Sequence, residues 1–118
     1  MARILLAEDD NSLRGFLARA LERAGHEVVV CENGDEAISA LGEGPWDLLL
    51  TDIVMPGADG IEVAREAAQR QPELRIMFIT GFAAVALTAA QSAPRAKVLS
   101  KPVHLRDLVS EVERMIAA

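Results

Sequence analysis

The chain has 118 residues, the usual size of one domain, and 51% of them are hydrophobic, which is enough to build a core. Its net charge of −6 and the lack of a basic run argue against nucleic-acid binding, which places Lys and Arg against phosphates. No apolar run approaches the ~20 residues that a membrane-spanning helix needs, which argues against membrane insertion.

Strand and helix patterns alternate from the first residues on. Met1-Ala2-Arg3 leads directly into an apolar run over residues 3–7, a predicted strand, and leaves no room for a signal peptide. Asp10 is the expected cap of a helix that stops at Gly25, with one apolar face that holds Leu13, Phe16, Leu17, Ala20, Leu21 and Ala24. A second strand over 27–31 ends at the only cysteine, which cannot form an internal disulfide and therefore fits a reducing cytoplasm.

The remaining elements continue this alternation. A helix begins near Asn33, a strand covers 47–51, and Asp59 caps a helix over 60–70. A strand over 75–79, a helix within 83–91, a strand within 96–100 and a helix with Leu105, Leu108, Val109, Val112 and Ile116 on one face complete the pattern. Such short apolar strands are typical of a parallel sheet buried on both faces. Five βα units without a linker predict one doubly wound α/β domain over 1–118, with no effector domain.

Polar side chains stand where the predicted strands end. Glu8 and Asp9 follow the first strand, Asp52 the third, Thr80 the fourth and Lys101 the fifth. Because chemistry gathers at the carboxyl ends of the strands in parallel sheets, we expect these five residues to share one crevice. Asp52 alone would be interpreted as a cap or a loop carboxylate, but with four such partners it is a candidate reactive group.

Three carboxylates in one crevice require compensation. Two unit charges ~5 Å apart repel by roughly 3 kcal/mol at an effective dielectric constant of about 20, so either a pKa rises or a cation binds. Oxygen ligands without nearby His or Cys favour Mg²⁺ over zinc. A carboxylate beside Mg²⁺, a lysine and a hydroxyl suits phosphoryl transfer, with Asp52 as the nucleophile that becomes an acyl phosphate.

The chain resembles the receiver domain of two-component response regulators over nearly its whole length. The matching pieces, in order, are Glu8-Asp9, Asp52, Met55-Pro56 with Gly60, Thr80, and Lys101-Pro102. The resemblance implies the flavodoxin-like (CheY-like) fold with strand order 2-1-3-4-5.

The resemblance also implies roles for individual residues. Asp52 would accept a phosphoryl group from a histidine kinase or histidine phosphotransferase. Asp9 and Asp52 would ligate Mg²⁺ directly together with the backbone carbonyl of Val54, and Glu8 would act mainly through water. Thr80 and Lys101 would bind the phosphoryl oxygens. The bond between Lys101 and Pro102 would be cis.

One position departs from the family pattern. Many receivers carry an aromatic ring where this chain has Val98, and that ring turns inward when the threonine moves. Without the ring, coupling between the site and the surface is expected to run through the helix within 83–91 and its preceding loop.

The segments 76–87 and 98–105 resemble more narrowly the stand-alone receivers of alphaproteobacteria that serve the ClpXP protease. That resemblance implies a monomeric cytoplasmic adaptor in cell-cycle control, recruited to a cell pole and active when unphosphorylated. Its partners would be ClpX or ClpXP and their substrates. It would not be an enzyme acting on other molecules.

The helix within 83–91 is apolar beyond the one stripe that an outer helix needs. We expect a partner surface of Phe82, Val85 and Val98, although alanine is also simply a good helix former and the larger residues could be core. Ala117-Ala118 is a candidate degradation tag for a ClpXP-type protease, or else a frayed helix end.

Three other functions stay open. A phosphate shuttle or sink would pass the phosphoryl group on without binding an effector. A haloacid-dehalogenase-like phosphotransferase would need an aspartate two residues after the nucleophile, where this chain has Val54. A flavodoxin-like cofactor carrier would need an aromatic pair or a phosphate loop, and neither is visible.

Overall fold

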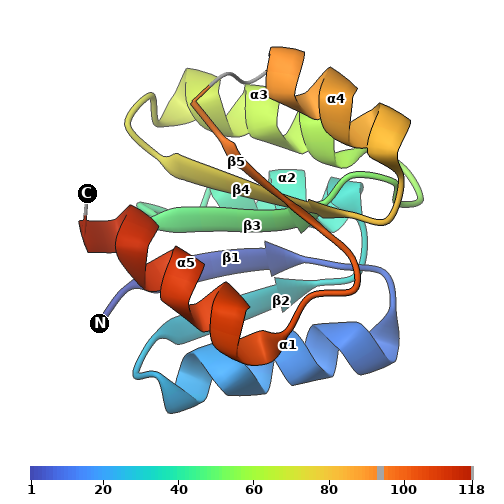
Figure 1. The fold of residues 1–118 in the computed structure, drawn as a ribbon. Helices are drawn as coiled ribbons and strands as arrows, with labels where there is room; N and C mark the ends of the chain where they lie inside the picture. The colour runs from blue at the N-terminus through green and yellow to red at the C-terminus, as the bar shows by residue number, and fades with distance from the viewer. Residues whose placement is uncertain (93–94, 118) are drawn as a thin grey trace.

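A five-stranded parallel sheet forms the centre of the computed structural model, which describes residues 1–92 and 95–117. The strands lie in the order β2-β1-β3-β4-β5 (Figure 1), which confirms the predicted fold. Their bounds are β1 Arg3–Ala7, β2 Glu27–Cys31, β3 Leu48–Asp52, β4 Arg75–Thr80 and β5 Lys97–Ser100.

Within the described residues, five helices cover the two faces of this sheet. They are α1 Asn11–Arg23, α2 Gly34–Leu41, α3 Gly60–Arg70, α4 Ala83–Ser92 and α5 Leu105–Ala117. One core cluster packs α1 and α5 against one face through Leu17, Leu21, Leu108 and Val112. The other packs α2, α3 and α4 against the opposite face through small residues such as Ala37, Ala64, Ala67 and Ala89. None of the helices in the described part of the chain is long and apolar enough to cross a membrane.

Side-chain caps set where three of the helices begin. Asp10 accepts a hydrogen bond from the amide of Leu13, Asn33 from that of Glu36, and Asp59 from that of Glu62, at 2.8 to 2.9 Å. Each cap satisfies an amide that has no partner inside its helix. The cap role predicted for Asp10 and Asp59 is therefore confirmed.

Two strands extend one residue further than predicted and so include candidate site residues. Asp52 is the last residue of β3 and pairs in register with Ile79, and Thr80 closes β4 opposite Ser100. The ladder holds both residues because a neighbouring strand runs beside each of them. Their side chains are therefore placed by the sheet, which is more rigid than a loop.

The expectation that all strands are buried on both faces was wrong at the sheet edges. β1 and β3, in the middle, are buried almost throughout, but β2 and β5 are half-exposed. An edge strand has a neighbouring strand on one side only, so its other side meets solvent.

Phe16, predicted on the apolar face of α1, lies outside the buried part of that face. Its side chain is 54% exposed, and the guanidinium of Arg19 lies 5.5 Å from the centre of its ring. The stripe of α1 that faces the sheet is narrower than the sequence pattern suggests, because only Leu17 and Leu21 point fully inward. Phe16 precedes Leu17 by one residue, about 100° round the helix.

The loop after β3 is held by two glycines that allow close backbone contact. A Cβ at Gly60 would overlap the carbonyl oxygen of Asp52, and one at Gly34 would overlap that of Ala58. Glycine at these positions lets the loop approach both the end of β3 and the start of α2.

We predict that Gly60→Ala lowers the free energy of unfolding by about 1–3 kcal/mol, because the new methyl group must displace backbone atoms. Gly15→Ala is the control: in mid-α1 its Cβ would lie 3.6 Å from the Arg19 guanidinium, an ordinary contact, so the helix should gain about 0.5–1 kcal/mol. Urea titrations of the two variants measure both effects. Equal stability of Gly60→Ala and the parent chain would contradict the close contact.

Candidate phosphoacceptor and metal site

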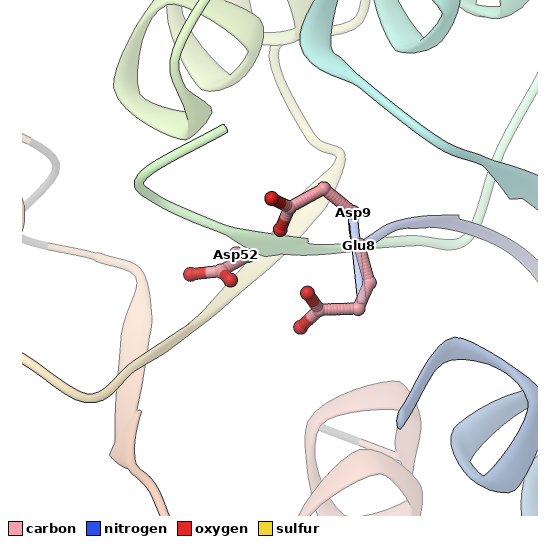
Figure 2. A group of neighbouring side chains, drawn as sticks. All are labelled: Glu8, Asp9 and Asp52. Atoms are coloured by element: carbon pink, nitrogen blue, oxygen red, sulfur yellow. The ribbon is translucent and has the colours of Figure 1, made fainter. Parts of the chain in front are cut away.

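Three carboxylates meet at the carboxyl ends of β1 and β3 (Figure 2). One oxygen from each of Glu8, Asp9 and Asp52 lies within 4.8 Å of the others. Glu8 and Asp52 are buried, whereas Asp9 is exposed. The cluster is therefore anchored in the protein and open to solvent on one side, so that a hard cation could enter and find oxygen ligands.

Lys101 supplies the positive charge of this cluster. Its Nζ lies 2.9 Å from Asp52 Oδ2, to which it donates a hydrogen bond, and 3.2 Å from Glu8 Oε1. Burial lowers the pKa of Lys101, but the hydrogen bond from Lys101 to Asp52 and the charges of Asp52 and Glu8 outweigh it and raise the pKa overall. The ammonium therefore stays charged between the two acids.

Backbone geometry brings Lys101 into the site. Its amide donates to the carbonyl of Thr80 at 2.8 Å, which continues the β4–β5 pairing by one residue. The following peptide bond, to Pro102, is cis.

Glu8 is the most buried acid of the site, at 1% exposure. Burial raises the pKa of Glu8 to about 7, and the charge of Asp52 acts in the same direction, although a hydrogen bond from the amide of Asp10 and the charge of Lys101 oppose them. Its Oε1 is close enough to Lys101 for an ion pair but lacks hydrogen-bond geometry. One lysine thus leaves three carboxylates only partly compensated, a donor set that fits a divalent cation.

The buried hydroxyl of Thr80 faces the start of the next loop. Its Oγ1 accepts a hydrogen bond from the amide of Phe82 at 3.1 Å. Asp52 Oδ1 is similarly engaged, by the amide of Ile53 at 2.7 Å. Both side chains are therefore oriented by backbone donors of the loops that follow their strands.

The remaining candidate residues lie around this centre. Val54, on the loop after β3, is exposed, and Phe82, before α4, is 61% exposed. Val85 and Val98 are half-buried and pack against the core cluster under α2, α3 and α4. Ala117 ends α5, and Ala118 lies outside the described residues.

Sequence reasoning missed Arg14 and Leu87. Arg14, on α1, donates from Nη1 to the carbonyl oxygen of Glu8 at 2.9 Å and pairs with Glu32, so it holds the backbone beside the acids. Leu87 is 62% exposed on α4. The apolar excess of the helix was the signal for Leu87, whereas nothing local in the sequence points to Arg14.

The chain matches one protein family over most of its length and is similar to a known member of that family. The family described as the response regulator receiver domain matches residues 4–113. The response regulator receiver protein CpdR of Brucella abortus (strain 2308) is 63% identical over 100% of this chain and 99% of its own length.

Solved structures agree with this match. The response regulator TrrA of Thermotoga maritima, in complex with Mg²⁺-BeF, is 30% identical with a TM-score of 0.86, over 98% of this chain and 99% of that one. A CheY-like receiver domain protein of Methanospirillum hungatei is 26% identical with a TM-score of 0.91, over 99% and 94%. The chain therefore belongs to the family of response regulator receiver domains of two-component systems.

Proposed function

We propose that Asp52 accepts a phosphoryl group from a phosphohistidine of a histidine kinase or histidine phosphotransferase, and that the chain turns over no other substrate. The observation that carries this proposal is the 2.9 Å contact between Asp52 Oδ2 and Lys101 Nζ inside a cluster of three carboxylates. Family membership supports it, because receiver domains take phosphoryl groups from histidine kinases.

In the proposed step a carboxylate oxygen of Asp52 forms a bond to phosphorus while the bond between phosphorus and the imidazole nitrogen breaks. The electron pair of the broken bond stays on the imidazole. The ammonium of Lys101, which pairs with the Asp52 carboxylate before the step, pairs with the phosphoryl oxygens after it. The hydroxyl of Thr80 donates a hydrogen bond to one of these oxygens. The product is an acyl phosphate on Asp52.

We infer that the acidic cluster holds Mg²⁺. Asp9 and Asp52 would be direct ligands with the backbone carbonyl of Val54, and Glu8 would act mainly through water. The bound ion would supply positive charge beside the phosphoryl oxygens. The likeness to TrrA, whose structure contains Mg²⁺-BeF, supports this choice of ion.

The output that we propose is protein binding by an adaptor of ClpXP-type regulated proteolysis, active when Asp52 is unphosphorylated. The 63% identity to CpdR supports it. The binding surface would include Phe82, Val85 and Val98, in a cytoplasmic single-domain protein. Thr80 would connect site and surface: when its hydroxyl turns to a phosphoryl group, the amide of Phe82 loses its acceptor.

We predict that Mg²⁺ with a small-molecule phosphodonor adds one phosphoryl group to the chain and that Asp52→Asn abolishes the addition, because the amide is not a nucleophile. Intact-mass spectrometry measures the product. Asp59→Asn, which changes a half-buried cap residue outside the cluster, is the matched control and should be labelled like the parent chain. Persistent labelling of Asp52→Asn would reassign the acceptor.

A second prediction concerns pH. The pKa of Glu8 is about 7 in the folded chain against an ordinary value of 4.5, so the folded state holds this proton more tightly than the unfolded state does. Glu8 therefore costs stability as the pH rises from about 4.5 to 7, by up to about 3 kcal/mol in the metal-free protein. Urea unfolding in a chelator between pH 5 and 8 measures this loss.

Glu8→Gln should remove most of that pH dependence, and Mg²⁺ should raise the melting temperature of the parent chain at pH 8 more than at pH 5. Glu113→Gln, at an exposed position of α5, should behave like the parent chain. If the unfolding free energies of Glu8→Gln and the parent chain changed equally with pH, Glu8 would not be the source of the pH dependence.

If the chain is an adaptor that is active when unphosphorylated, immobilised ClpX should retain Asp52→Ala more strongly than the phosphorylated parent chain. Phe82→Ala in the Asp52→Ala background should weaken retention about ten-fold or more, as expected for an aromatic anchor. Phe16→Ala is the matched control, since Phe16 is the other exposed phenylalanine and lies on α1. Rapid return of phosphate to a phosphotransferase without ClpX binding would instead identify a shuttle.

A further inference from the structure

The outer edge of β2 is open. In a parallel pair, alternate residues turn both backbone groups towards the neighbouring strand. The amide of Glu27 donates to Ala2 at 2.9 Å and the carbonyl of Cys31 accepts from Glu8 at 3.1 Å, so the odd-numbered residues of β2 face β1. The even-numbered residues Val28 and Val30 therefore point their N–H and C=O groups away from the sheet. Figure 1 shows β2 as the last strand on this side.

A groove of about 440 Å³ runs along this edge, between β2 and α2. Its apolar lining is Val29, Cys31 and Ala40, which belong to the core cluster under α2. Val30, at the rim, is 47% exposed. Together the open edge and this lining, here called the β2 groove, offer unpaired backbone groups next to an apolar channel.

The charged side chains that line the β2 groove are all negative. Asp35, Glu36 and Glu43 line it, and none of the ion pairs within residues 1–92 and 95–117 involves them. Asp35 and Glu36 accept hydrogen bonds from backbone amides, which orient the two carboxylates but bring no positively charged side chain to them. Burial raises the pKa of the Cys31 thiol to about 11, and the charges of Glu36 and Glu43 act in the same direction.

We propose that the β2 groove binds an extended, Lys- or Arg-containing segment of a partner protein, which adds to the sheet as a sixth strand beside β2. The segment's main chain would pair with Val28 and Val30. Every second side chain would lie in the channel, with its aliphatic stem on Val29 and Ala40 and its charged head at Glu36 and Glu43. The side chains between them would be apolar and cover Val30.

The negative charge of the β2 groove favours a basic segment of a partner protein over a second copy of this acidic chain. The chain carries a net charge of −6, and pairing β2 with another β2 would bring two acidic rims together. Like charges across paired strands destabilise a sheet, and charged edges are a common protection against such self-association. The inference is independent of the phosphoacceptor proposal, because no residue of the β2 groove belongs to that site.

The test is an NMR titration of the ¹⁵N-labelled full chain with a capped seven-residue peptide of alternating lysine and valine. The amides of Val28 and Val30 should shift and become protected from hydrogen exchange. Those of Val29 and Cys31, which already face β1, provide an internal control and should keep their protection. Unchanged Val28 and Val30 amides at saturating peptide would overturn the proposal.

Two comparisons separate strand addition from general attraction to an acidic protein. A peptide of alternating lysine and proline has the same charge but cannot extend a sheet, and equally tight binding of it would overturn the proposal. Glu43→Gln should weaken the lysine–valine peptide about two- to five-fold, whereas Glu113→Gln, of equal charge on α5, should not. If Val28 and Val30 respond to protein concentration without peptide, the occupant is a second copy and the proposed partner is wrong.

Discussion

Repulsion among Glu8, Asp9 and Asp52, which a single lysine only partly offsets, is the constraint around which this domain is organised. Two of the acids are almost completely buried, where an uncompensated charge is most costly. The protein meets that cost in two ways. Lys101 lies between Asp52 and Glu8, and Glu8 binds its proton more tightly than usual. In this cluster the repulsion among the carboxylates is only just offset by Lys101 and the Glu8 proton. A bound cation or added charge on Asp52 therefore changes the electrostatic energy of the site directly.

The sheet fixes the positions of the charged and polar side chains at the site. Asp52 and Thr80 are the last residues of adjacent central strands, and Lys101 is hydrogen-bonded to the end of β4. Gly60 and Gly34 permit the loop after β3 to lie against both the strand end and α2. The acids are thus positioned by strands whose faces are buried. When the charge at the site changes, the rigid strands keep their place and the exposed loops are the parts that can move.

The outer surface of the domain is not uniform. Apolar side chains are exposed on the loops after β3 and β4, at Val54 and Phe82, and on α4, at Leu87. The outer edge of the sheet at β2 is an open strand beside acidic residues of α2. These two surfaces differ in chemistry: the first is apolar and joined to the site through the Thr80–Phe82 hydrogen bond, and the second is acidic and lies along the outer edge of β2. A domain of this size can therefore present separate binding surfaces of different selectivity.

The sequence by itself determined the elements, their order in the chain and the residues at the strand ends, because apolar periodicity, helix caps and glycines are local signals. It also predicted that Glu8, Asp9, Asp52, Thr80 and Lys101 share one crevice, since parallel strands bring their carboxyl ends together. Tertiary structure alone decided the outward position of Phe16, the exposure of β2 and β5, and the contact of Arg14 with the Glu8 carbonyl. These features depend on which neighbour each side chain or strand edge meets, and no pattern within a single segment carries that information.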